Sequence, residues 1–200
     1  FLAPNSIVGC GIEMAPEAEW SGVKAKYELP DEYVLYLGRV SKAKVDKLRP
    51  YFLRCKAKYG GDAKLVLVGG FENEIRKFDS PDILFTGYVS DEEKTAIVRH
   101  ATVMVNPSPM ESLSLLMLEG MQSRIPLLVN GRSKVMKDHC RLSGAGLWYN
   151  NGRDFRKKLH RLLSDPELRR TMSEKGPAYV REHYDWEIII PKLRTLIESI

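Results

Sequence analysis

Short apolar segments alternate with longer amphipathic segments over most of the chain. Strand-like runs cover residues 34–38, 64–69, 83–86, 102–106 and 125–129, with a further candidate at 146–149. Glycine follows several of them, as expected where a strand gives way to a turn. Because the runs are continuously apolar, they predict parallel strands that are buried on both faces of a sheet.

Segments with helical spacing separate these runs. They cover residues 45–59, 91–100, 112–123, 153–163, 166–183 and 186–200, with Pro191 expected to interrupt the last. Ser90 and Glu93 form a capping box ahead of one helix, and Pro166 stands at the start of another. The alternation predicts an α/β fold with a Rossmann-like, doubly wound parallel sheet, whose ligands bind at the carboxyl ends of the strands.

Three regions follow from this pattern. Residues 1–30 contain several prolines and glycines and predict an interdomain connection or an N-terminal strand and loop. Residues 31–183 form the predicted Rossmann-like domain, and residues 184–200 form a C-terminal helix.

Composition narrows the class of protein. The 200 residues are 44% apolar, yet no apolar run reaches the roughly 18 residues of a membrane span, and no signal-peptide pattern is present. Cys10, Cys55 and Cys140 are far apart, which favours reduced thiols in a cytoplasmic protein. The net charge of +5 suits an anionic ligand or peripheral contact with an anionic membrane, but its scatter argues against nucleic acid.

The segment 105–129 carries the strongest candidate site. A strand ends at Asn106, a proline-rich turn follows, and a helix is predicted to begin near Ser112. The N-terminus of such a helix binds anions through unpaired backbone N–H groups. Ser108 and Ser114 offer hydroxyl groups there, although both could also be ordinary caps.

Glu111 and Glu119 bracket this predicted helix. Glu119 is the one charged residue in the apolar stretch 113–121, so its carboxylate needs a defined partner. Over a continuous helix the two residues would stand about 12 Å apart, which suits a diphosphate flanked by a sugar and a ribose. The alternatives are a salt bridge to a neighbouring helix for Glu119 and a solvated loop acid for Glu111.

Two weaker groups follow other strands. Arg39 and Lys44 come after the first strand and could bind phosphate, or they could be ordinary surface cations. Tyr88 and Val89 follow the third strand and could hold a nucleobase, or form a plain turn. The sequence has no DxD motif, no phosphate loop, no GxSxG elbow and no complete dinucleotide fingerprint, so we expect neither a metal nor a cofactor.

These residues resemble the retaining glycosyltransferases of the GT-B architecture, the "glycosyl transferases group 1" family. The resemblance runs from about residue 33 to the end of the chain. It rests on an E-x7-E motif from Glu111 to Glu119, on Arg39 and Lys44, and on an F-x-G-x-V segment at residues 85–89. The chain departs from the family pattern where Ser112 and Ser114 replace two glycines, which leaves the identity of the donor open.

The resemblance implies a role for each matching residue. Arg39 and Lys44 would hold the diphosphate of a UDP- or GDP-sugar and assist catalysis, while Glu111 would contact the transferred hexose. Glu119 would contact the ribose, and backbone amides near Leu113, Ser114 and Leu115 would bind phosphate. Tyr88 and Val89 would lie beside the base.

The resemblance also implies a partner domain. An N-terminal domain outside this chain would bind the sugar, glycan or lipid-linked acceptor, and the helix at residues 184–200 would pack toward it. We therefore expect the chain to bind a nucleotide sugar without turning it over. A catalytically inactive sugar-nucleotide-binding module, a sugar-nucleotide epimerase and a nucleic-acid binder are the alternatives.

Overall fold

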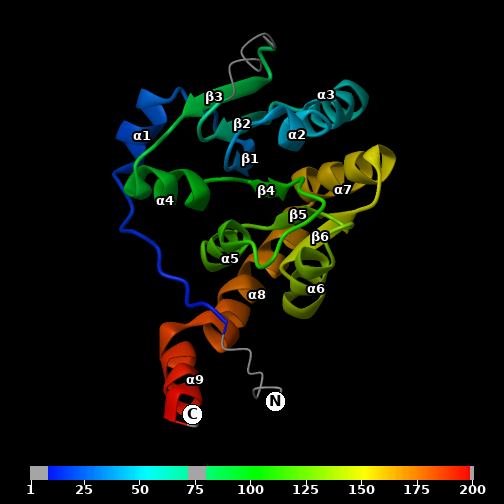
Figure 1. Ribbon diagram of the computed structural model, residues 1–200. Coiled ribbons are helices and arrows are strands. Elements are labelled where there is room, and N and C mark those ends of the chain that lie inside the picture. Colours follow the sequence, from blue (N-terminus) through cyan, green and yellow to red (C-terminus); the bar gives the residue numbers. More distant parts are fainter. Residues whose placement is uncertain (1–8, 72–79, 199–200) are drawn as a thin grey trace.

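A single parallel sheet organises the chain. The computed structural model describes residues 9–71 and 80–198 (Figure 1). The six strands are β1 (Tyr33–Leu37), β2 (Lys64–Val68), β3 (Ile83–Gly87), β4 (Val103–Asn106), β5 (Leu127–Asn130) and β6 (Gly146–Tyr149). All neighbouring strands pair in parallel, in the order β3-β2-β1-β4-β5-β6, which confirms the predicted Rossmann-like fold.

Helices connect the strands and cover both faces of the sheet. They are α1 (Trp20–Lys26), α2 (Lys42–Val45), α3 (Leu48–Tyr59), α4 (Asp91–Arg99), α5 (Leu115–Gln122), α6 (Lys134–Ser143), α7 (Gly152–Ser164), α8 (Pro166–Tyr184) and α9 (Trp186–Glu198). The Ser90–Glu93 capping box predicted for α4 is present in both directions. The strands therefore follow the order expected from the sequence, whereas helices α1 and α6 were not predicted from it.

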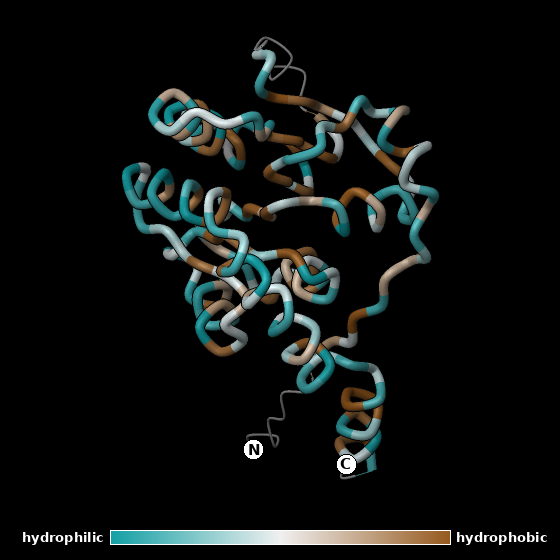
Figure 2. Tube along the Cα trace, turned by 180° about the vertical axis from the view of Figure 1, so that it is seen from behind, coloured by the Kyte–Doolittle hydropathy of each residue, from teal (hydrophilic) through white to brown (hydrophobic). Residues whose placement is uncertain are grey.

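Two hydrophobic cores lie on opposite sides of the sheet. Along β1, Leu35 belongs to the core that includes residues of α4, α5, α6 and α8, whereas Val34 and Tyr36 belong to the core that includes residues of α2, α3 and α7. Both sets are almost fully buried, which explains why the strand is apolar at every position. Figure 2 shows the same arrangement, with the strands forming an apolar centre between more polar helices.

Four details differ from the sequence-based prediction. Residues 1–30 include helix α1, whose N-cap is the side chain of Glu19, although only residues 9–30 of this segment are described. The helix expected at 45–59 is divided into α2 and α3, and the helix expected from Ser112 begins at Leu115. Helix α9 continues through Pro191 without interruption.

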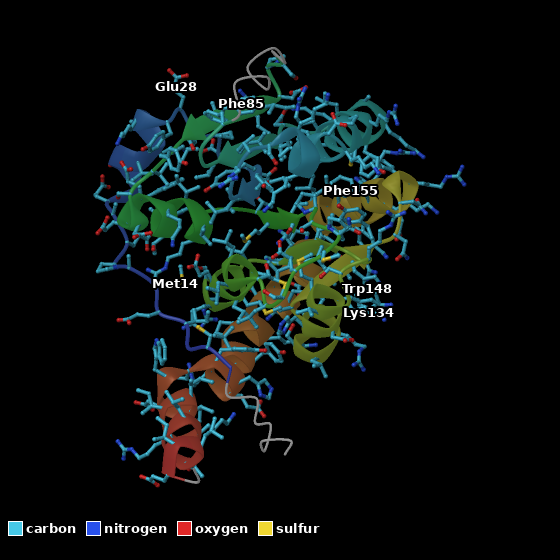
Figure 3. The ribbon with its side chains drawn as sticks, in the orientation of Figure 1. Met14, Glu28, Phe85, Lys134, Trp148 and Phe155 are labelled. Carbon is cyan, nitrogen blue, oxygen red and sulfur yellow. The ribbon has the colours of Figure 1, made fainter. Side chains whose placement is uncertain are left out.

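The N-terminal segment and the C-terminal helix meet at one end of the molecule. The Ile12 N–H donates to the carbonyl of Tyr184 at 2.8 Å, and Ser123 Oγ lies 3.3 Å from Met14 Sδ. Figure 3 shows Met14 on this segment, and Figure 1 shows α9 projecting beyond the body of the domain. Packing of α9 against an N-terminal domain stays a prediction.

Candidate functional site

A cleft opens where the winding of the sheet reverses, between β1 and β4. Its volume is about 460 Å³, and Leu37 and Gly38 from the end of β1 face Asn106 from the end of β4 across it. The remaining walls come from α2, the loop before α5, the first turn of α5 and Cys10. Ligands of doubly wound sheets bind at this switch point.

Several predicted residues meet in this cleft. Lys44, Glu111, Leu113, Ser114 and Leu115 all line it. The cleft therefore brings a cation, a carboxylate and the start of helix α5 together at the carboxyl edge of the sheet. Such a set can bind a phosphate and a hydroxyl-bearing group side by side.

Ser114 has the left-handed backbone conformation, with φ of 64°, immediately before helix α5. Asn106 Nδ2 donates to Ser114 Oγ at 3.1 Å, which ties the loop to the end of β4. Glycine adopts the left-handed conformation without strain, which explains why a glycine suits this position. In this chain the position holds a serine, whose side chain accepts the hydrogen bond from Asn106.

Helix α5 presents its N-terminus to the cleft. Met117 and Leu118 both donate to the Ser114 carbonyl, so the N–H groups of Leu115 and Leu116 precede the helical hydrogen bonds. Because Glu111 lies before the helix, the 12 Å separation predicted from helical rise does not apply.

Glu111 shares the cleft with a buried phenol, that of Tyr36. Tyr36 also lines the cleft, and its Oη donates to the Arg39 carbonyl at 2.8 Å. Burial, and secondarily the charge of Glu111, raise the pKa of Tyr36, so it stays a neutral hydroxyl.

Glu119 does not line the cleft; it lies on α5 on the side that faces α4. Its side chain is 14% exposed, and Lys94 Nζ lies 3.3 Å from Oε1. Its other oxygen, Oε2, is buried and has no hydrogen-bond partner among the described residues. The carboxylate thus makes the salt bridge to a neighbouring helix and still has an acceptor oxygen to offer, and such an orphan is costly unless a ligand satisfies it.

Three predicted residues stand along the same edge of the sheet but outside the cleft. Tyr88, at the end of β3, is 86% exposed, and Val89 packs against the core. A Cβ atom on Gly70 would lie 2.4 Å from Tyr88 Oη, so the glycine at the end of β2 makes room for this ring. Arg39 is exposed beyond β1.

Ser108 has a local structural role. Its hydroxyl donates to the carbonyl of Met110 at 2.7 Å, and its N–H donates to Asn106 Oδ1 at 3.0 Å. The side chain is committed to the turn and does not line the cleft. Its predicted contact with the donor would therefore require this turn to change.

Four residues of this region were not predicted from the sequence: Lys94, Tyr36, Asn106 as a side chain, and Cys10 as a wall of the cleft. Asn106 was detectable as the polar residue that ends an apolar strand. Lys94 gave no signal, because its pairing with Glu119 spans 25 positions in the sequence.

The described part of the chain gives two findings on metal binding and membrane spanning. Within residues 9–71 and 80–198, no group of three or more His, Cys, Asp or Glu side chains is placed to hold a metal ion. None of the helices in the same ranges combines the length and the apolar character needed to cross a bilayer.

Known proteins resemble this chain in sequence. The sequence profile of the family described as "Glycosyl transferases group 1" matches residues 22–179. An alpha-D-kanosaminyltransferase of Streptomyces kanamyceticus is 30% identical over 174 residues, which cover 80% of this chain and 44% of that protein. The chain spans less than half the length of the curated relatives it matches.

Solved structures share the fold. The Anabaena protein Alr3699/HepE, in complex with UDP and glucose, has a TM-score of 0.75 at 12% identity, covering 92% of this chain and 54% of its own. The C-terminal domain of a glycosyl transferase group 1 family protein, LpcC of Francisella tularensis, has a TM-score of 0.69 at 19% identity. That match covers 86% of this chain and 95% of the LpcC domain.

Proposed function

The chain belongs to the glycosyl transferases group 1 family, and from this premise we propose that it is the donor-binding domain of a retaining glycosyltransferase. The enzyme would transfer a hexose from a UDP- or GDP-sugar to an acceptor hydroxyl. One observation carries this proposal: the cleft at the β1/β4 switch point joins Lys44, Glu111 and the N-terminus of α5. The match to a solved C-terminal domain of similar extent supports the assignment to the donor half.

The cleft suggests how the donor would lie. Its diphosphate would rest at the N-terminus of α5 beside Lys44, where backbone N–H groups and a cation offset the charge that develops on the leaving group. Arg39 would swing toward the same phosphates from its exposed position. This arrangement would work without a metal ion.

The two carboxylates would bind the hydroxyl groups of the two sugar rings. Glu111 would accept hydrogen bonds from hydroxyls of the transferred hexose, and the free Oε2 of Glu119 would accept them from the ribose. Tyr88 and Val89 would lie beside the base at the end of β3. An N-terminal domain of the same polypeptide would supply the acceptor and close the cleft.

Calorimetric titration tests the proposal. UDP, GDP, ADP and their sugar conjugates are titrated into this chain without added metal, beside Lys44→Met and a matched variant, Lys192→Met, on the exposed surface of α9. We expect one diphosphate to bind and Lys44→Met to weaken it by about 1–3 kcal/mol, as for a lost charged hydrogen bond. Absence of binding by every nucleotide, or equal loss in both variants, would contradict the proposal.

Testing the retaining mechanism requires a longer, catalytically active protein that contains this chain. The anomeric configuration of its first product, followed by NMR, should match that of the donor. Inversion would overturn the retaining mechanism and leave the donor-binding assignment intact.

A further inference from the structure

A second cleft opens beside the first, at the carboxyl ends of β4, β5 and β6. Its volume is about 540 Å³, larger than that of the cleft at the switch point. Pro107, Asn130 and Tyr149 mark the ends of the three strands in its wall. None of the residues proposed to bind the donor lines it except Lys44, which lines both clefts.

The second cleft is strongly basic. Its walls carry Lys42, Lys44, Lys47 and Arg132 against one carboxylate, that of Asp46. Among the ion pairs found in residues 9–71 and 80–198, none involves the side chains of Lys44, Lys47 or Arg132. Cations gathered in a concave wall focus a positive potential that attracts an anion.

The uncharged part of the wall suits a sugar. Tyr51 and Tyr149 both line the cleft with their ring centroids 6.4 Å apart in an edge-to-face arrangement, and Tyr149 is almost fully buried. Asn150 and Asn151 lie at the mouth, where amide groups can hydrogen-bond hydroxyls. Asn151 is also the N-cap of the 13-residue helix α7, and its Oδ1 accepts hydrogen bonds from the N–H groups of Arg153 and Asp154.

The loop before α5 separates the two clefts. Pro107 and Pro109 face the basic cleft, whereas Glu111 and Ser112 face the cleft at the switch point. A molecule in the basic cleft would therefore lie across this short loop from the place proposed for the transferred hexose.

We propose that the basic cleft binds a phosphorylated sugar, with the phosphate held by Lys47 and Arg132 and the ring against the tyrosines. Binding of the sugar phosphate in this cleft does not rest on the proposed function.

The test uses glucose 6-phosphate as the probe and isotope-labelled chain for NMR titration. Glucose and inorganic phosphate are titrated separately, and the series is repeated with UDP present. We expect glucose 6-phosphate to shift the amide signals of Lys47, Arg132 and Asn150 and to bind more tightly than either fragment.

Two double variants with equal loss of charge provide the control. Lys47→Met/Arg132→Met should weaken glucose 6-phosphate by about ten-fold or more and leave UDP binding unchanged, since neither residue lines the cleft at the switch point. Lys192→Met/Arg194→Met, on the exposed surface of α9, should change it less than about two-fold.

Several results would overturn the inference. They are no shift at the basic cleft, equal loss in the two double variants, or equal affinity for inorganic phosphate and glucose 6-phosphate. If the chain binds UDP but does not bind glucose 6-phosphate, this inference alone is refuted. Binding of glucose 6-phosphate at the basic cleft without any nucleotide diphosphate would refute the proposed function and leave the sugar-phosphate cleft standing.

Discussion

Lys94 Nζ lies 3.3 Å from Glu119 Oε1 and joins helix α4 to helix α5 across 25 positions in the sequence. Both side chains are mostly buried, at 21% and 14% exposure. The pair places an ammonium group against one oxygen of a mostly buried carboxyl group, whose second oxygen has no partner among the described residues. An ion pair and an unsatisfied buried acceptor therefore occur in one side chain.

Replacement of Glu119 by glutamine should weaken the binding of UDP by about 1–3 kcal/mol, because an amide is a poorer acceptor for ribose hydroxyls than a carboxylate. Calorimetry with UDP and 2′,3′-dideoxy-UDP measures this effect. The dideoxy compound should bind the parent chain and Glu119→Gln equally. Glu92→Gln, at an exposed position on α4, is the control. An equal loss for both nucleotides would refute the ribose contact.

Removal of the cation should act on stability. Lys94→Met leaves the Glu119 carboxylate without its partner, so the free energy of unfolding should fall by roughly 1–3 kcal/mol. The double variant Lys94→Met/Glu119→Gln should recover part of that loss, because no unpaired charge remains. Urea unfolding of the parent, both single variants and the double variant measures the coupling. Strictly additive losses would show that the pair contributes nothing.

Ser114 tests the strained turn before α5. Ser114→Ala keeps the left-handed backbone and loses the hydrogen bond from Asn106, so it should destabilise the fold by about 1–2 kcal/mol. Ser114→Gly loses the same bond but relieves backbone strain of about 1 kcal/mol, and should lie closer to the parent. Chemical denaturation compares them. A glycine variant less stable than the alanine variant would contradict this account.

The three cysteines should differ in reactivity. Burial raises the pKa of Cys55 to about 11 and that of Cys140 to about 12, so both remain protonated and shielded at neutral pH. Cys10 is half-buried and lines the cleft at the switch point. Ellman's reagent should modify one thiol in the native chain and three in urea. Saturating UDP should slow the first reaction, and an unchanged rate would place the nucleotide away from Cys10.

Glu93 gives the fold a pH dependence. Lys26 at 2.6 Å is the main reason that the pKa of Glu93 is lowered to about 2, with help from the Ser90 N–H and Tyr27 Oη. A carboxyl whose pKa is depressed in the folded state stabilises the fold above its unfolded pKa, and loses that contribution as pH falls toward the folded value. The effect should therefore disappear between about pH 4.5 and pH 2.

Urea unfolding of the parent chain and Glu93→Gln at pH 6 and pH 3 checks this window. The parent should be more stable by roughly 1 kcal/mol at pH 6, which is the scale of a helix cap with a surface ion pair. The difference should shrink at pH 3. A difference that grew on acidification would reverse the assigned sign.

The sequence by itself determined the succession of strands, the parallel sheet and the edge where ligands are expected to bind. Continuously apolar runs such as residues 65–68 are stable only when both faces are covered, and parallel strands then bring their carboxyl ends to one side. The capping box at Ser90 was equally readable, because it depends on groups three residues apart.

Only the tertiary structure decided the partners of the site residues. The start of α5 was misplaced because Ser114 adopts a left-handed conformation held by Asn106, eight residues away on β4. The partner of Glu119 lies on another helix, and the basic cleft draws its cations from α2, from the start of α3 and from the loop after β5. Such contacts join residues distant in the chain, and no local periodicity encodes them, so they become definite only when the sheet places its loops side by side.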